Sequence, residues 1–294
     1  MPTVPVAVVQ DAPFAFDLER TLDKVAALTT QAAQTGARLI VFPEAFVGGY
    51  PKGADFGARV GMRSDAGREW FRRYFDGAME LNGPGGKRLG EIAAENNVDL
   101  MIGVIEREGG TLYCTAAHFG DDGALVNHHR KVMPTAVERL IWGFGDASTL
   151  DVVQRDYGKV GAAICWENYM PRLRAHYFDQ HVQIYCAPTV DDRDVWQATM
   201  RHIAVEGRCF VLASCQFARR GDFPDDYECI RGNDPETVLI RGGSVIIDPF
   251  GEILAGPAFD ETTILRADLD LDQITRGKFD LDVAGHYGRP DLWR

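Results

Sequence analysis

Short apolar runs alternate with amphipathic segments along the first hundred residues. The run at 4–10 is rich in valine and almost continuously apolar, which is typical of a buried strand. After Asp17, apolar residues recur at steps of three and four, so we expect a capped helix with one core-facing stripe. The same patterns predict three further elements: a strand at 37–46 stopped by Pro43, a helix around 85–96 and a strand at 99–108.

Tight turns join many of the strands predicted after residue 110. Asp-Asp-Gly divides 111–131 into two β-like runs, and Asp156-Tyr157-Gly158 divides 150–165 in the same way. A third hairpin is predicted at 243–256, with its turn at Pro249-Phe250-Gly251. The other predicted elements are helices near 171–180 and 192–207 and strands at 182–190, 209–217 and 262–271.

This mixture of connections indicates the fold class. Strands joined by helices alternate with strands joined by turns, so we expect mixed sheets and not a purely parallel one. The sequence predicts an α/β (α+β) fold in which two sheets pack face to face with helices outside. No low-complexity stretch or linker interrupts the chain, so we expect a single domain, residues 1–294. The long loops at 48–63 and 218–241 indicate a site, an interface or a lid.

Composition and charge narrow the range of partners. Hydrophobic residues make up 46% of the chain and charged residues 25%, as in globular proteins with a large core. The formal net charge is −12, which argues against nucleic-acid binding, and short basic clusters such as 69–75 are expected to be solvated faces. The apolar run near the N-terminus is too short for a secretory leader or a membrane span, so no membrane partner is expected.

The cysteine pattern bears on metals and on the redox compartment. The six cysteines form no C-x-x-C pair, and most lie in apolar segments. This pattern argues against a disulfide framework and against a zinc cluster, and it fits a reduced cytoplasmic setting. His128 and His129 are adjacent in a predicted strand and would point to opposite faces, which makes them a poor chelating pair.

Three segments end in a reactive group. "LIVFPE" ends in Glu44, "VNHHRK" contains Lys131 at its end, and "GAAIC" ends in Cys165. A free thiol is only about 3% ionised at neutral pH, so a nucleophilic cysteine needs a base or a nearby cation. Glu44 is a candidate base, and Lys131 is a candidate cation that would also stabilise developing negative charge. Each group alone is weak evidence, because a lone cysteine after a strand usually belongs to the core.

The longer motifs around these groups strengthen the case. They are "FPEAFVGGYPKG" (42–53), "HRKVMPTAVERLIWGFGD" (129–146) and "CWENYMP" (165–171). In this order and at these spacings they resemble the nitrilase superfamily of carbon-nitrogen hydrolases, and within it the true nitrilase branch. The resemblance covers nearly the whole chain. It implies a four-layer α-β-β-α sandwich, in agreement with the two sheets expected above, and no metal or organic cofactor.

The resemblance also implies roles for individual residues. Matched by position, Cys165 is the nucleophile, Glu44 the general base and Lys131 the stabilising cation. A second glutamate, Glu138, would orient Lys131 and the substrate; the alternative is an ordinary carboxylate on a helix surface.

Four aromatic and acidic residues in these motifs carry further expectations about the pocket. The Trp-Glu pair after the cysteine looks like the nitrile-hydrolysing branch. The backbone N–H of Trp166 is expected to join Lys131 in an anion hole, with the Trp166 side chain as a pocket wall. Glu167 is either a structural hydrogen-bond acceptor or a group near the site. Tyr50 could line the substrate pocket or pack within its loop. Trp142 is expected at the pocket or its rim, with a plain core position as the alternative.

The implied reaction converts an organic nitrile and two waters into a carboxylic acid and ammonia through thioimidate and thioester intermediates on Cys165. An amidase or carbamoyl hydrolase with the same machinery is the alternative, and a non-catalytic scaffold is a third hypothesis. The class of nitrile stays open, because it depends on how the loops at 48–63, 135–146 and 189–196 fold together.

Two departures from the family pattern qualify the resemblance. Ala147 stands where the family often has the second glycine of Gly-Asp-Gly. The chain also ends soon after "GHYGRPD", where many family members carry a further tail that helps them form spirals, which argues against very large assemblies. Because family members pair by extending the sandwich across an interface, the resemblance implies a homodimer or a higher homo-oligomer.

Overall fold

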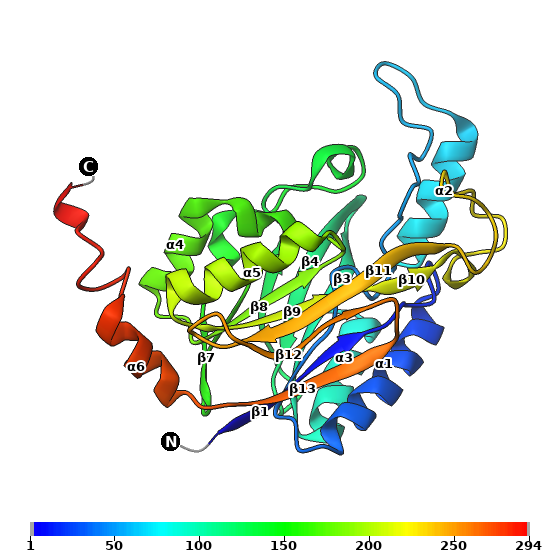
Figure 1. Cartoon of the computed structure of the whole chain (residues 1–294). Coiled ribbons are helices and arrows are strands. Elements are labelled where there is room, and N and C mark those ends of the chain that lie inside the picture. Colours follow the sequence, from blue (N-terminus) through cyan, green and yellow to red (C-terminus); the bar gives the residue numbers. More distant parts are fainter. Residues whose placement is uncertain (1–2, 293–294) are drawn as a thin grey trace.

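The computed structural model describes residues 3–292. Two mixed β-sheets face each other at its centre, with helices on both outer sides (Figure 1). In spatial order, the first sheet contains β13 (Thr263–Leu269), β1 (Val4–Gln10), β2 (Leu39–Val41), β3 (Asp99–Glu108), β4 (Thr111–Phe119) and β5 (Leu125–Arg130). The second contains β10 (Phe217–Arg219), β11 (Val238–Ile247), β9 (Phe210–Cys215), β8 (Ile184–Thr189), β7 (Gly158–Ala162) and β6 (Val153–Arg155), with β12 (Ile253–Phe259) also paired to β11.

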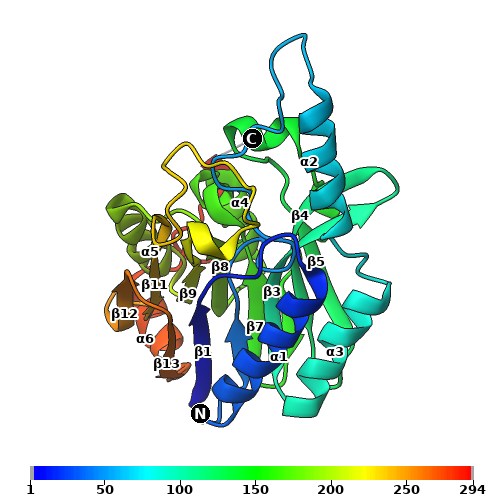
Figure 2. The same cartoon turned by 90° about the vertical axis from the view of Figure 1, so that its right-hand side faces the viewer.

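Helices α1 (Leu18–Ala33) and α3 (Pro84–Asn96) lie side by side on the outer face of the first sheet (Figure 2). The predicted apolar stripe of α1 is buried there, and the Asp17 carboxylate caps the helix by accepting from the backbone N–H of Arg20. α3 begins at Pro84, as a proline at the first helical position favours. One layer of the predicted sandwich is therefore explained by local sequence signals.

Helices α4 (Pro171–Asp179) and α5 (Asp194–Gly207) cover the second sheet. Trp196 and Met200 of α5 are fully buried against it, in an apolar cluster that also holds Tyr185 of β8. With this fourth layer in place, the two mixed sheets and the α-β-β-α arrangement predicted from the sequence are confirmed.

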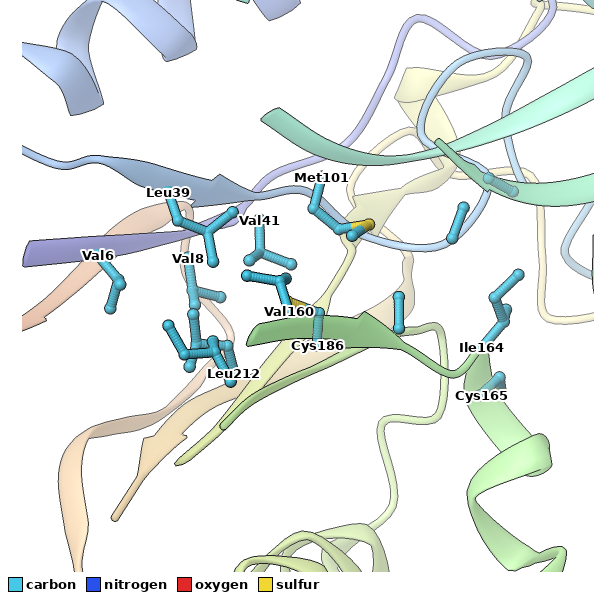
Figure 3. Packing of buried hydrophobic residues seen from close by; sticks show 14 of the residues in the cluster. Val6, Val8, Leu39, Val41, Met101, Val160, Ile164, Cys165, Cys186 and Leu212 are labelled. Atoms are coloured by element: carbon cyan, nitrogen blue, oxygen red, sulfur yellow. The ribbon is translucent and has the colours of Figure 1, made fainter. Parts of the chain in front are cut away.

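The central core lies between the two sheets. Val8, Val41 and Met101 project from the first sheet toward Cys186 and Leu212 of the second (Figure 3). Ile164 and Cys165 lie at one end of this layer. Strands buried on both faces need continuous apolar sequence, which is why β1 and β8 show no alternation.

Two helices have no counterpart among the predicted elements, α2 (Asp65–Asp76) and α6 (Asp272–Asp280). The segment 69–75 was expected to be a solvated face, and its arginines are indeed exposed or half-exposed. Tyr74 in the same segment is fully buried, however, and its hydroxyl donates to the carbonyl of Gly49 at 3.0 Å. α2 therefore braces the loop that carries Tyr50.

The two long loops lie against each other, and no described helix could cross a membrane. The loops at 48–63 and 218–241 pack on each other, since the Tyr227 hydroxyl donates to the carbonyl of Lys52 at 2.9 Å. In the part of the chain that the structure describes, no helix has the length and apolarity needed to cross a bilayer.

Candidate active site

The predicted reactive residues meet where several strands end. Glu44 follows β2, Lys131 follows β5, and Cys165 begins the short 3-10 helix η3 (Cys165–Tyr169) after β7. Glu138 lies in η1 (Ala136–Leu140), within the loop that follows Lys131. The Nζ atom of Lys131 donates to Oε1 of Glu44 at 2.7 Å and to Oε2 of Glu138 at 2.8 Å. Both ion pairs are withdrawn from water, so their geometry is tightly constrained.

Tight backbone bends orient the side chains of Glu44, Glu138 and Cys165. Ala45, Ala136 and Cys165 have positive φ values of 51°, 48° and 49°, a conformation that residues other than glycine seldom adopt. One such residue follows Glu44, one opens η1, and one is the candidate nucleophile itself. Backbone strain of this kind costs about 1–3 kcal/mol per residue and concentrates at functional sites.

Cys165 is a buried thiol, with 4% of its surface exposed. Burial raises the pKa of this thiol far above its usual value, and the negative charge of Glu44 raises it further. The Lys131 charge and a hydrogen bond with the Thr189 hydroxyl oppose these effects only in part. The resting group at neutral pH is therefore the thiol, and its attack on a substrate requires a base.

Glu44 and Lys131 have mutually dependent charges. Burial raises the pKa of Glu44, while the adjacent Lys131 charge lowers it. Burial would lower the pKa of Lys131, but the carboxylate of Glu44 and other nearby groups hold it well above its ordinary value. Lys131 consequently stays a cation, and Glu44 is a carboxylate with an increased affinity for a proton.

A cavity of about 280 Å³ leads to Cys165. Its lining includes Tyr50, Glu138 and Trp166, so the structure brings these predicted residues together with the thiol. The Tyr50 hydroxyl donates to Oε1 of Glu138 at 2.7 Å, which leaves neither oxygen of Glu138 without a partner. Glu138 is thus not an ordinary surface carboxylate.

A second cavity of about 380 Å³ adjoins the first and shares Tyr50, Lys52 and Glu138 with it. Trp142 is buried in its wall, with its ring edge-on to that of Tyr50 at 5.8 Å between centroids. Trp142 lines this second cavity and also belongs to the apolar core between the sheets, and Nζ of Lys131 lies 5.6 Å from the centroid of its ring.

Trp166 forms part of the cavity wall and is 42% exposed. Its indole N–H donates to Oδ2 of Asp191 at 2.8 Å, and the guanidinium of Arg193 lies 4.8 Å above its ring. Arg193 also pairs with the Asp191 carboxylate, which closes a three-residue clamp. The orientation of this wall is therefore set by the loop after β8.

Glu167 has a structural role in this arrangement. Its buried carboxylate accepts from the backbone N–H groups of Val132 at 2.6 Å and Ile164 at 2.8 Å, and it contacts Nε2 of His129 at 2.9 Å. One side chain thus ties the segment that carries Lys131 to the segment that carries Cys165. His129 faces inward and His128 lies on the other face, as the strand alternation predicts.

Several groups that support the site were missed in the sequence. The side-chain amide of Gln216 donates to the carbonyl of Glu44 at 2.7 Å, and Thr189 contacts the thiol of Cys165. Asp191 is a third such group, and Cys114, whose thiol reaches Glu44, is a fourth. None of them stands in a recognisable motif, so only the three-dimensional arrangement reveals them.

The departure at Ala147 is accommodated locally. Ala147 opens a short 3-10 helix, and the Asp146 carboxylate caps it by accepting from the N–H of Ser148. The preceding Gly145 donates its N–H to the carbonyl of Lys131 at 2.9 Å. A Cβ on Gly145 would meet the carbonyl oxygen of Arg130 at 2.0 Å, so glycine is needed here for close approach.

Potential metal ligands are not gathered at this site. Within residues 3–292, no group of three or more His, Cys, Asp or Glu side chains is arranged to hold a metal ion. Oε1 of Glu44 and Oε2 of Glu138 instead accept from Lys131, and Oε1 of Glu138 accepts from Tyr50.

Comparisons with known proteins agree with this fold. The model of the carbon-nitrogen hydrolase family matches residues 5–279. A nitrilase of Bradyrhizobium diazoefficiens is 58% identical over 99% of this chain and 91% of its own length. An aliphatic nitrilase of Sinorhizobium fredii is 54% identical over 98% of this chain and 93% of its own length.

Among solved structures, Nit3 of Saccharomyces cerevisiae, a member of the nitrilase superfamily, superimposes with a TM-score of 0.75 over 97% of both chains. At 21% sequence identity, this likeness concerns the fold alone.

The family match and the two nitrilase relatives define a hydrolase acting on carbon-nitrogen bonds. The chain belongs to the carbon-nitrogen hydrolase family, that is, to the nitrilase superfamily.

Proposed function

We propose that this protein hydrolyses an organic nitrile to the carboxylic acid and ammonia, with Cys165 as the nucleophile. The observation that carries the proposal is the position of Cys165. It lies at the end of a cavity and beside the Glu44–Lys131–Glu138 cluster, in a chain 58% identical to a protein named a nitrilase.

The first half of the proposed reaction forms a covalent intermediate. The Cys165 thiol gives its proton to Glu44 as Sγ attacks the nitrile carbon. The proton passes to the nitrile nitrogen, which yields a thioimidate. Lys131 and the backbone N–H of Trp166 stabilise the negative charge that develops on that nitrogen. This order fits a thiol that is protonated at rest, because the base acts only during the attack.

The second half of the reaction consumes two waters. Glu44 removes a proton from the first water as it adds to the thioimidate, which gives a tetrahedral intermediate. Departure of ammonia leaves a thioester, and a second water releases the acid and restores the thiol. If the tetrahedral intermediate expels the thiol instead, an amide is released. Glu138 holds Lys131 and Tyr50 in place throughout.

Substrate selection is assigned to the cavity walls. Tyr50, Trp142 and Trp166 line the two adjoining cavities, and their rings suit an apolar substituent on the nitrile. Aliphatic, aromatic and arylacetonitrile substrates and hydrogen cyanide all belong in the test.

The test is ammonia release from a panel of these nitriles, compared with release from the matching amides. We expect nitriles to be turned over much faster than amides, with acid as the main product. Amides turned over faster than every matching nitrile would instead assign an amidase or carbamoyl hydrolase with the same Glu-Lys-Cys machinery. The acid-to-amide ratio, measured by chromatography in the same reactions, reports how the tetrahedral intermediate partitions.

We also propose a homodimer or higher homo-oligomer in a reduced cytoplasmic setting. Tyr169, Met170 and Val195 have exposed side chains, and the Tyr169 hydroxyl lies 3.4 Å from Oγ1 of Thr199, one turn after Val195 in α5. This exposed apolar face supports pairing of copies there. All six cysteines lie within the described residues and are free, which supports a reducing compartment. Sedimentation velocity tests the first proposal, since a concentration-independent monomer would contradict it.

A further inference from the structure

The two carboxylate oxygens of Glu44 have different surroundings. Oε1 accepts from Nζ of Lys131 at 2.7 Å and from Sγ of Cys114 at 3.5 Å. Oε2 is buried and has no hydrogen-bond partner among the atoms of residues 3–292. Buried polar atoms are rarely left without a partner, and a free acceptor oxygen at this position has a ready use in proton transfer. The carboxylate is therefore held through one oxygen, while the other is free to react.

Cys114 is placed to hold both charged groups of the cluster. It lies on β4, and its carbonyl accepts from the backbone N–H of Lys131 at 2.8 Å. Its thiol, 1% exposed, points to Glu44. One residue thus contacts the main chain of the cation and the side chain of the base.

We propose that Cys114 is a positioning residue for the hydrolysis: its thiol donates to Oε1 of Glu44 and orients the carboxylate so that Oε2 accepts the proton of Cys165. The proposal rests on the proposed function for its catalytic consequence. In the step concerned, the S–H bond of Cys165 breaks and its proton moves to Oε2, while Sγ bonds to the nitrile carbon. One π-electron pair of the C≡N bond moves to the nitrogen, which then takes the proton from Oε2 and completes the thioimidate.

Cys114 is suited to donation and not to attack. It does not line the cavity that leads to Cys165, so a substrate in that cavity does not reach its sulfur. Burial and the charge of Glu44 hold the pKa of its thiol well above the usual value, so it keeps its proton. A thiol is a weak donor, so its hydrogen bond to Glu44 should contribute a free energy at the low end of the range for protein hydrogen bonds.

The charged and titratable groups around Glu44 determine in which direction the loss of Cys114 shifts the pKa of Glu44. They are Lys131 after β5, Glu138 in η1, Tyr50 in the loop after β2, Cys165 in η3 and Cys114 in β4. The Cys114 donor stabilises the ionised form of Glu44. Its removal therefore raises the pKa of the base, so the acid limb of any process that needs ionised Glu44 moves to higher pH.

The experiment follows the rate of Cys165 alkylation by iodoacetamide across pH, quantified at this residue by peptide mass spectrometry. This measurement requires no nitrile. It compares the wild type with Cys114→Ala, Cys114→Ser and a control, Cys186→Ala. Cys186 is equally buried in the core between the sheets, and within the described chain no hydrogen bond of its side chain is found.

In the profile of alkylation rate against pH, we expect the acid limb, the fall in rate on the acid side, to lie at least about half a pH unit higher for Cys114→Ala than for the wild type. Below that limb, the alkylation rate of Cys114→Ala should be about threefold lower. Cys114→Ser keeps a donor, so its limb should lie at or below that of the wild type. Cys186→Ala should leave the limb unchanged even if it lowers the melting temperature. The same shift should appear in the pH profile of kcat/KM for the best nitrile.

Identical limbs in the wild type, Cys114→Ala and Cys186→Ala would overturn the proposal and make Cys114 a plain core residue. If Cys114→Ala does not fold, Cys114→Ser decides, because an upward move of its limb would contradict a donor role. If the wild type hydrolyses no nitrile while the alkylation limb still shifts, the proposed function fails and the positioning role of Cys114 stands.

Discussion

At the scale of single residues, burial makes it energetically unfavourable for the Cys165 thiol and the Glu44 carboxyl group to be ionised at the same time. Burial and the Glu44 charge raise the pKa of Cys165, and burial raises the pKa of Glu44. Lys131 offsets part of this cost with an ion pair to each of the two glutamates. The arrangement keeps the Cys165 thiol protonated, in contrast to a cysteine that is activated as a resting thiolate.

The activity should depend on the ionisation of Glu44, the proposed base. Because Glu44 acts when ionised and its pKa is raised, kcat/KM should fall on acidification at a pH above the ordinary glutamate value of about 4.3. Glu44→Gln should lower kcat/KM by about 10²–10⁴-fold, the usual contribution of a general base. Steady-state rates across pH test both statements. A Glu44→Gln variant with a wild-type profile would assign the base elsewhere.

At the scale of elements, β3 shows how a strand can shape the site without contributing a reactive group. Gly103 lies against the bend that carries Glu44, and its N–H donates to the carbonyl of Pro43 at 3.1 Å. A Cβ here would meet that oxygen at 2.3 Å and Cα of Glu44 at 2.6 Å. Glycine is therefore required so that the two backbones can approach.

Gly103→Ala should consequently displace Glu44 from Lys131 or destabilise the fold. We expect kcat/KM to fall by about 10²-fold, as small misplacements of catalytic groups do, and stability to fall by about 1–3 kcal/mol or more. Gly110→Ala is the matched control, because a Cβ there meets no atom within 4 Å. Denaturant unfolding and nitrile turnover measure the two effects. Equal behaviour of the two variants would contradict this role of Gly103.

The success of sequence-based prediction also varies by element. Where the apolar pattern is strong, as in the stripe of α1 and the continuous run of β3, the predicted and observed ranges agree closely. The strand predicted at 37–46 is much shorter, because the chain leaves regular structure after Val41 to form the bend at Glu44. α2 was missed because half of its residues are charged. Its core-facing side chains are only the four aromatic residues Trp70, Phe71, Tyr74 and Phe75, which pack against the core between the sheets.

The same limit applies to the site. The positions of Glu44, Lys131 and Cys165 at strand ends, together with three ordered motifs, were sufficient to predict that they would meet. Gln216 could not be predicted, because its contact with the backbone of Glu44 joins residues far apart in the chain and on different sheets. Such contacts depend on how the two sheets are aligned, which no local pattern encodes.

At the scale of the whole molecule, a buried polar network joins the two sheets away from the site. Asp99 of β3 accepts from the guanidinium of Arg155 in β6 at 2.7 Å and from the hydroxyl of Tyr157. His118 of β4 lies 3.2 Å from the same carboxylate. Burial opposes ionisation of Asp99, but hydrogen bonds from these three partners hold its pKa at about 2. The charged carboxylate of Asp99 therefore links the first sheet to the second.

This network should make the fold sensitive to acid. The folded pKa of Asp99 lies below the unfolded value of about 3.9, so its contribution is complete above that pH and is lost as pH falls through about 2. Asp99→Asn should cost about 3 kcal/mol at neutral pH, because it leaves the Arg155 charge without its main partner, and it should flatten the acid dependence. Urea unfolding at several pH values below 5 measures this. An acid dependence unchanged in Asp99→Asn would contradict it.

The central claim, that Cys165 is the nucleophile of a nitrile hydrolase, is tested most directly by ammonia release from the best nitrile of the panel. The comparison is between the wild type, Cys165→Ala and the core control Cys186→Ala, all checked for native circular dichroism. We predict rapid release by the wild type, release within a few fold of it by Cys186→Ala, and none above background by Cys165→Ala. Ammonia released by folded Cys165→Ala at a rate comparable to the wild type would contradict the account.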